Sequence, residues 1–236
     1  MKLGIMQPYF FPYLGYFSLI KHTERFIFLD CVQFIRHGWI TRNRILKPGS
    51  GWQYILVPLV KQSRDTKIRD IRIKNALDWR NTIFRQLEHY KRKAPFYRDT
   101  IEVLKVAFNI ETESIVRLNA HALKTVCGYI GVGLNLDIFS EMYLSIGDVK
   151  VPDEWALSIC KALGNVDEYW NPEGGLEFFD RSKYDKFGID IKFLKMNSQK
   201  YSQNRPEFEA DLSIVDVMMF NKPEKINKML DDYRLS

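Results

Sequence analysis

Apolar positions fall into short continuous runs and helical spacings along the first part of the chain. Residues 2–6, KLGIM, predict a buried strand, and Pro8 and Pro12 exclude regular structure directly after it. The segment YLGYFSLIKH, residues 13–22, has helical spacing, and ERFIFLDCVQF, residues 24–34, predicts a second strand. The order strand, proline-glycine loop, helix, strand is a βαβ unit, whose strands pair in parallel through a right-handed crossover.

Two more strands are predicted before residue 75, and beyond them most apolar residues have helical spacing. Those strands are WQYILVPLV, residues 52–60, and the alternating segment IRDIRI, residues 68–73. We predict helices over residues 76–94, 96–108, 112–130 and 152–164, and two short helices near the C-terminus that are separated near Pro223. Thr112 is the predicted N-cap of the third helix. Short strands are predicted over residues 136–144 and 189–194. Residues 168–180, EYWNPEGGLEFFD, are expected to be rich in turns. We therefore expect one α/β domain over residues 1–236, with an N-terminal βαβ Rossmann-like sheet, helices on both faces and a helical middle segment, in which 75–130 forms a helical subdomain.

Charge adds a basic bias, because the formal net charge is +6. Residues 61–74 and 89–98 are basic, whereas the last third of the chain holds much of the acid. Such segments are solvated faces, or they bind nucleic acid, an anionic membrane surface or a phosphorylated metabolite. We expect no nucleic-acid partner, because no helix-turn-helix, zinc-finger or RNA-binding signature accompanies the charge.

Cysteine usage and the opening segment indicate a cytoplasmic protein. The three cysteines are widely spaced without a CxxC pair, which favours free thiols over a disulfide framework or a metal site. The opening segment lacks the basic and apolar regions of a signal peptide. Gln7, Pro8, Pro12 and Lys21 interrupt it well short of about 20 apolar residues, so we expect no membrane span.

Candidate ligand-binding residues follow the first predicted strand. Open α/β sheets bind ligands beyond the carboxyl ends of their strands, and free N–H groups at a helix start attract anions. The loop QPYFFPYLGY lies between that strand and the next helix, so Gln7, Tyr9 and Tyr13 are candidates. The alternative is that its aromatic residues belong to the core.

A second candidate cluster lies in RHGWITRNRI, because arginine forks suit phosphate or carboxylate and tryptophan offers a stacking face. Its candidate binding residues are Arg36, Trp39, Arg42, Asn43 and Arg44, with Lys67 in a following polar loop, and Tyr201 and Gln203 in the later segment KYSQNRPEF. His37 is the best candidate acid or base. Solvated loops with one anchoring tryptophan are the alternative interpretation. No GxGxxG, P-loop, GxSxG or HExxH motif occurs.

Several segments together resemble the WbqC-like protein family. They are MQPYFFPYLGYF, DCVQFIRHGWITRNRI, VPLVKQSRDTKI, YKRKAPFY, the glycine pair in EYWNPEGGLEFFD, and YSQNRPEFEADLSIVDVMMFN, and the first two are the most specific. Cys31 stands where the pattern usually has an aspartate, which argues against a role for this thiol as a nucleophile. The resemblance implies a product of bacterial surface-polysaccharide gene sets, especially O-antigen and lipopolysaccharide synthesis.

The implied activity is a transferase that adds a small acyl or aminoacyl group, such as glycyl, to the amine of a nucleotide-linked amino sugar. On this hypothesis the arginines and Lys67 meet the diphosphate, the aromatic residues stack, and His37 accepts the amine proton. The sequence leaves open whether ATP with magnesium takes part and whether the protein is a homo-oligomer.

The alternative function is a non-catalytic binding or scaffold protein of the polysaccharide assembly machinery. Convergence of Gln7, His37, Arg42 and Asn43 into one deep pocket would favour the enzyme, and a flat basic face would favour docking. A metal-dependent glycosyltransferase is disfavoured, because no DxD-type acid pair suited to a metal occurs.

Overall fold

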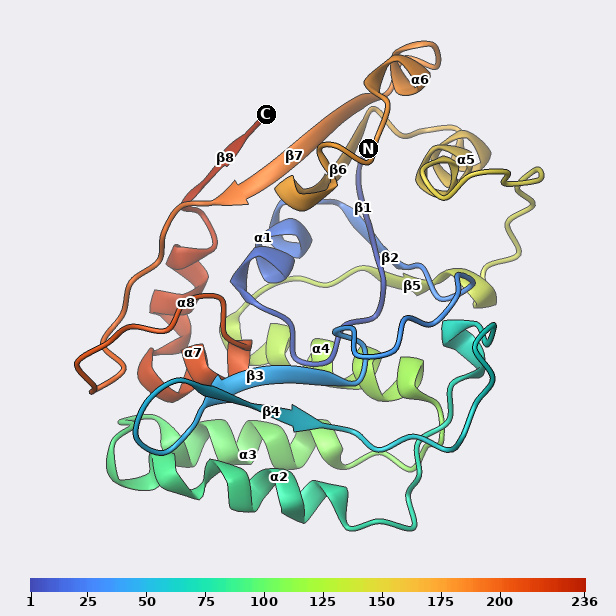
Figure 1. Ribbon diagram of the computed structural model, residues 1–236. Helices are drawn as coiled ribbons and strands as arrows, with labels where there is room; N and C mark the ends of the chain where they lie inside the picture. Colours follow the sequence, from blue (N-terminus) through green and yellow to red (C-terminus); the bar gives the residue numbers. More distant parts are fainter.

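The computed structural model describes residues 1–236 and contains one six-stranded sheet (Figure 1). Its strands are β1 (Lys2–Met6), β2 (Arg25–Phe28), β5 (Leu136–Ile138), β6 (Glu168–Pro172), β7 (Asp190–Met196) and β8 (Tyr233–Leu235), in the order β5-β2-β1-β6-β7-β8. All neighbours pair in parallel except β7 and β8. The chain leaves β1 toward β2 and β5 and returns on the other side at β6. The strand order therefore reverses between β1 and β6, which is where sheets of this kind bind ligands.

Helices cover both faces of the sheet, as expected for the α/β class. Helix α1 (Leu14–His22) joins β1 to β2 and confirms the predicted βαβ unit. The larger core lies on the side of α1, and a smaller core packs Leu3 and Ile5 of β1 against α5 (Glu154–Leu163) and α6 (Arg181–Asp185). The other helices are α2 (Trp79–Leu87), α3 (Tyr97–Phe108), α4 (Ile115–Ile130), α7 (Ile214–Phe220) and α8 (Pro223–Met229), with 3-10 turns at Ile68–Asp70, Glu88–Arg92, Phe139–Glu141 and Glu173–Gly175. No helix is long and apolar enough to cross a bilayer.

A separate antiparallel hairpin, β3 (Arg42–Leu46) and β4 (Trp52–Leu56), runs alongside α2 and α3, between these helices and the six-stranded sheet (Figure 1). The sequence predicts the strand that begins at residue 52 but no strand over Arg42–Leu46. The hairpin forms because Gly49 and Gly51 take positive φ values of 85° and 72° in the turn, which glycine adopts without strain.

Three other local predictions differ from the structure. The predicted strand at 68–73 is a 3-10 turn followed by isolated bridges; its isoleucines are buried as expected, but no continuous partner strand is available. The prediction of turns alone over 168–180 missed β6, because proline and paired glycines directly follow its apolar core. The N-cap of α4 is Ser114, whose hydroxyl accepts from the Arg117 amide, and not Thr112.

Candidate functional site

The loop between β1 and α1, residues 7–13, is hereafter called the opening loop. Side chains from distant elements hold its main chain in place. Asn43 Nδ2 of β3 donates to the carbonyls of Phe10 and Phe11 at 3.0 and 2.9 Å. Asn119 Nδ2 of α4 donates to a third carbonyl of the loop at 2.7 Å. Both amides are buried, so they satisfy main-chain groups that water cannot reach.

One residue of the opening loop is held in an unfavourable conformation. Phe11 has φ 40°, in the left-handed region that side chains other than glycine rarely adopt. Its carbonyl accepts from both Asn43 Nδ2 and Ser213 Oγ, the latter at 2.7 Å. Such strain persists only where the surroundings fix it, and it concentrates at functional sites.

A cavity of about 540 Å³ opens at the carboxyl ends of β6 and β7, beside the start of α1. It therefore lies next to the point at which the strand order reverses. Four segments line it: the start of α1, the turn after β6, the segment after β7, and residues 208–212. The lining residues used below are Tyr13, Leu14, Gly15, Glu173, Lys195, Asn197, Gln199, Tyr201 and Asp211.

The start of α1 offers an anion-binding surface to this cavity. No side chain caps the helix, and its first turn holds no acidic residue. The amides of Leu14 and Gly15 have no acceptor within the protein. A Cβ at Gly15 would lie 2.6 Å from the Tyr13 ring, so glycine is needed for this close approach. Unpaired amides and the helix dipole favour a negatively charged group here.

Charged side chains complete the wall of the cavity. Lys195 Nζ, at the end of β7, pairs with the Glu173 carboxylate at 2.6 Å, and both side chains are 41% exposed. Asn197 and Gln199 follow on the same segment, and both donate to Asp232. The cavity thus combines the helix-start amides, a lysine paired with a carboxylate, and the unpaired residue Asp211.

Asp211 is an exposed carboxylate with no hydrogen-bond or ion-pair partner. Its φ is 53°, again in the left-handed region, and its carbonyl accepts from Arg44 Nη2 at 3.0 Å. A carboxylate held under strain at the edge of a cavity can bind a cationic amine or accept its proton.

A buried acid lies behind the cavity. Tyr201 lines the cavity, and its hydroxyl donates to Asp216 Oδ2 at 2.7 Å. Tyr90 donates to Asp216 Oδ1 at 2.5 Å, and Gln203 Nε2 donates to Oδ2 at 3.2 Å. Burial raises the pKa of Asp216 to about 6, although these three hydrogen bonds favour its charged form. The network fixes the position of Tyr201 in the cavity wall.

The structure brings only some of the predicted site residues together. Tyr13 and Tyr201 line the cavity, and Gln203 lies directly behind it. Tyr9 is partly buried against Tyr16, with ring centroids 5.6 Å apart. Burial raises the pKa of Tyr9, so its hydroxyl keeps its proton.

The remaining predicted residues lie outside the cavity. The carbonyl of Gln7 accepts from the Tyr16 hydroxyl, and the side chain of Asn43 is used on the opening loop. The hairpin region contains Trp39, Arg42 and Arg44. On exposed loops, the Arg36 guanidinium donates to the Gln62 carbonyl, and the main chain of Lys67 forms an isolated β-bridge with that of Gln33. His37 is exposed with φ 63°, and its carbonyl accepts from Arg42. The four residues named as a test of convergence therefore do not meet in one pocket.

Sequence reasoning missed Lys195, Glu173 and Asp211. Glu173 directly follows β6, and Lys195 lies at the end of β7. A prediction of these two strands would therefore have identified Glu173 and Lys195 as candidates. The Cys31 thiol is no activated nucleophile, because burial raises its pKa.

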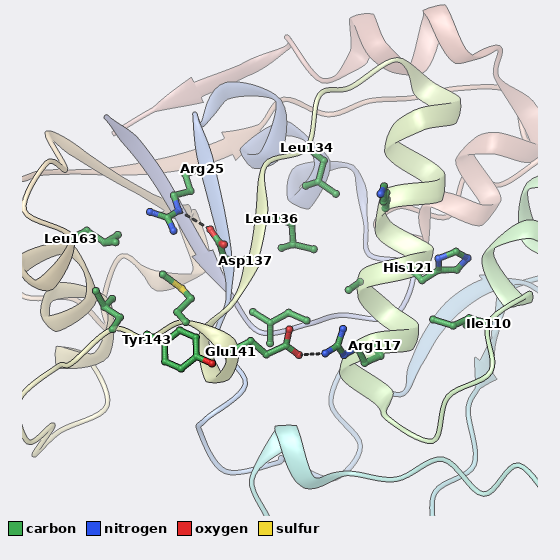
Figure 2. A pocket seen from close by; sticks show the side chains of 15 residues that line it. Arg25, Ile110, Arg117, His121, Leu134, Leu136, Asp137, Glu141, Tyr143 and Leu163 are labelled. Carbon is green, nitrogen blue, oxygen red and sulfur yellow. Dashed lines mark hydrogen bonds and ion pairs between the residues drawn. The ribbon is translucent and has the colours of Figure 1, made fainter.

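A larger cavity, about 810 Å³, lies elsewhere, between α4 and the edge strand β5 (Figure 2). Figure 2 shows that its two arginines face carboxylates: Arg25 pairs with Asp137 at 2.6 Å and Arg117 with Glu141 at 2.8 Å. These pairs involve both arginines of the cavity, whereas Lys124 forms no ion pair. The cavity at the ends of β6 and β7 is the better candidate because it lies next to the point at which the strand order reverses, where sheets of this kind bind ligands.

Comparison with known proteins gives two matches. The model of the WbqC-like protein family matches residues 7–228. The uncharacterized protein Rv1507c of Mycobacterium tuberculosis (strain ATCC 25618 / H37Rv) is 28% identical over 223 residues, which cover 93% of each chain. No solved structure matches this chain.

Proposed function

The chain belongs to the WbqC-like protein family, and on this premise we propose that it is a transferase of bacterial O-antigen or surface-polysaccharide synthesis. It transfers a small acyl or aminoacyl group, such as glycyl, to the amine of a nucleotide-linked amino sugar. One observation carries the proposal: a cavity lined by both apolar and polar residues lies next to the point where the strand order reverses, against an uncapped helix start. Its volume, about 540 Å³, is within the range of small-ligand sites.

The diphosphate of the substrate belongs at the start of α1. The free amides of Leu14 and Gly15 bind phosphate oxygens, and Lys195 adds a positive charge from the end of β7. A bound diphosphate competes with Glu173 for Lys195 and weakens this ion pair. The Glu173 carboxylate is exposed enough for water to solvate it instead. This placement differs from the one expected from sequence, in which the hairpin arginines held the diphosphate.

The reacting amine belongs beside Asp211. The neutral amine attacks the carbonyl carbon of an activated acyl donor, a C–N bond forms, and the bond to the donor's leaving group breaks. Asp211 accepts the proton that the nitrogen loses and releases it to solvent. Asp211 suits this role because the residue lines the cavity and its carboxylate has no hydrogen-bond or ion-pair partner in the protein.

The test is a substitution that removes the charge of Asp211 and keeps its shape. Asp211→Asn should abolish acyl transfer to nucleotide-linked amino sugars, measured by mass spectrometry, and leave their binding within about threefold by calorimetry. Asp185→Asn, at an exposed aspartate outside the cavity, is the matched control. His37→Ala, assayed in parallel, decides between His37 and Asp211 as the base.

A thermal-shift screen comes before these variants, since a ligand of the native state must raise the melting temperature. It compares nucleotide-linked amino sugars, free nucleotides, and ATP with magnesium. Arg42→Ala tests the alternative placement of the diphosphate on the hairpin, because a lost shift in this variant would move the phosphate there. A screen without any shift would refute the transferase.

The second candidate is a non-catalytic binding or scaffold protein of the polysaccharide assembly machinery. One observation favours it: Arg42 and Trp39 belong to an open basic and aromatic face, and not to a deep pocket. This candidate function would be supported if the protein bound the polysaccharide assembly machinery but bound no sugar nucleotide.

A further inference from the structure

We propose that the outward face of the β3–β4 hairpin docks on an anionic lipid bilayer. This surface, hereafter the hairpin face, consists of Trp39, Arg42, Arg44, Trp52, Tyr54 and Leu56. Strand register pairs Arg42 with Leu56 and Arg44 with Tyr54, and paired positions direct their side chains to the same side. Trp39 and Trp52 join them through Arg44, whose Cζ lies 5.4 and 5.3 Å from their ring centroids.

Large apolar side chains are exposed on and beside the hairpin face. Trp39 is 37% exposed, Trp52 38% and Leu56 52%. On the loops next to the hairpin, Ile35 is 62% exposed and Val60 45%. Gathered exposed apolar residues mark an interaction surface.

The same segment carries unpaired positive charge. Residues 36–67 contain seven lysines and arginines and one aspartate, a net of six positive charges, which equals that of the whole chain. None of the seven forms an ion pair with a carboxylate. The partner that complements this surface is therefore negatively charged.

The combination fits a bilayer better than nucleic acid or an acidic glycan. Nucleic-acid bases need free aromatic ring faces for stacking. Here the Arg44 guanidinium lies over Trp39 and Trp52, and that of Arg42 lies 4.0 Å from the Tyr54 centroid. Exposed aliphatic side chains gain nothing from phosphate or carboxylate groups, but they insert at the boundary between headgroups and acyl chains. Tryptophan and arginine also suit the membrane interface, because the tryptophan ring and the aliphatic part of arginine can face the acyl chains while the guanidinium stays at the headgroups.

Docking through the hairpin face places the candidate site near the membrane. Arg44 Nη2 bonds to the carbonyl of Asp211, whose residue lines the cavity. The cavity therefore opens beside the docked surface.

The experiment is cosedimentation of the full chain with vesicles of phosphatidylcholine, with or without roughly 30 mol% phosphatidylglycerol. We expect binding only to the anionic vesicles, and loss of most of it at about 0.5 M salt, because exposed charges are then screened. Lys61→Gln with Arg64→Gln should lower the partition coefficient about 25-fold, since each cation near an anionic surface contributes about fivefold. Trp52→Ser should lower it about tenfold through lost apolar burial. Unchanged urea midpoints show that the variants are folded.

Control variants separate a specific face from general charge attraction. Lys225→Gln with Lys228→Gln removes the same charge from exposed positions on α8 and should change partitioning less than about twofold. Phe178→Ser removes a 52% exposed aromatic residue elsewhere and should have no effect. Absence of vesicle binding at low salt, or equal losses in the controls, overturns the proposal. Tighter binding to a single-stranded oligonucleotide or to polygalacturonate also overturns it and assigns the face to that ligand.

Discussion

The buried carboxyl of Asp216 should make the stability of the protein depend on pH in a predictable direction. Burial raises its pKa from 3.8 to about 6 in the folded protein. A carboxyl with a higher pKa in the folded state stabilises the fold while it is protonated. This contribution is fully present below pH 3.8 and is lost as the pH rises through about 6.

The size of the effect follows from these two values. A carboxyl with these folded and unfolded pKa values increases the free energy of unfolding by about 1.4 kcal/mol between roughly pH 8 and pH 5. Asp216→Asn removes the titration. Its amide also changes the hydrogen bonds from Tyr90, Tyr201 and Gln203, but that cost does not depend on pH.

The assay is urea unfolding of wild type and Asp216→Asn at several values between about pH 5 and 8, followed by tryptophan fluorescence. Other titrating groups occur in both proteins, so they cancel in the difference. The stability of wild type relative to the variant should rise by about 1.4 kcal/mol toward the acid end. Parallel profiles, or a change of opposite sign, would refute the assignment of a raised pKa to Asp216. Asp185→Asn, an exposed control, should leave the wild-type profile unchanged.

Three further substitutions test the candidate site. Asn43→Ala leaves the buried Phe10 carbonyl without a donor and removes one of the two donors to the Phe11 carbonyl, so it should lower the free energy of unfolding by about 2–4 kcal/mol in urea titrations; a loss under about 1 kcal/mol would show that water replaces the amide. Gly15→Ala forces the Tyr13 ring to move and should weaken sugar-nucleotide binding about tenfold by calorimetry, and unchanged affinity would separate the helix start from the ligand. Asp211→Gly relieves the left-handed strain and should raise the free energy of unfolding by about 1 kcal/mol while it abolishes transfer. A less stable glycine variant would contradict the strain.

The fold could be predicted from the sequence wherever its signals are local. The apolar run of β1 and the helical spacing of α1 identify themselves within a few residues, and together they fix the βαβ unit. Strand β6 carries no such signal, because Pro172 ends it and a glycine pair follows after Glu173.

The candidate site could be predicted only in part, because distant segments assemble it. Tyr13 was found through its place before a helix, but Lys195 reaches the same cavity only through the pairing of β6 with β7. The sequence predicts a ligand-binding role for Asn43, whereas in the structure its amide donates to two main-chain carbonyls of the opening loop. A polar side chain that satisfies the main chain and one that binds a ligand look alike in sequence.

The support of the opening loop has a consequence for the order of events during synthesis. The opening loop is among the first segments to leave the ribosome, yet the donors to its carbonyls, Asn43, Asn119 and Ser213, are synthesised later. The last of these emerges only when most of the chain has been made, and domains form such long-range contacts late. A shortened chain that lacks α7 would therefore contain every residue of the loop without its working shape. The opening loop, and with it the candidate site, can take the shape described here only when nearly the whole protein is present.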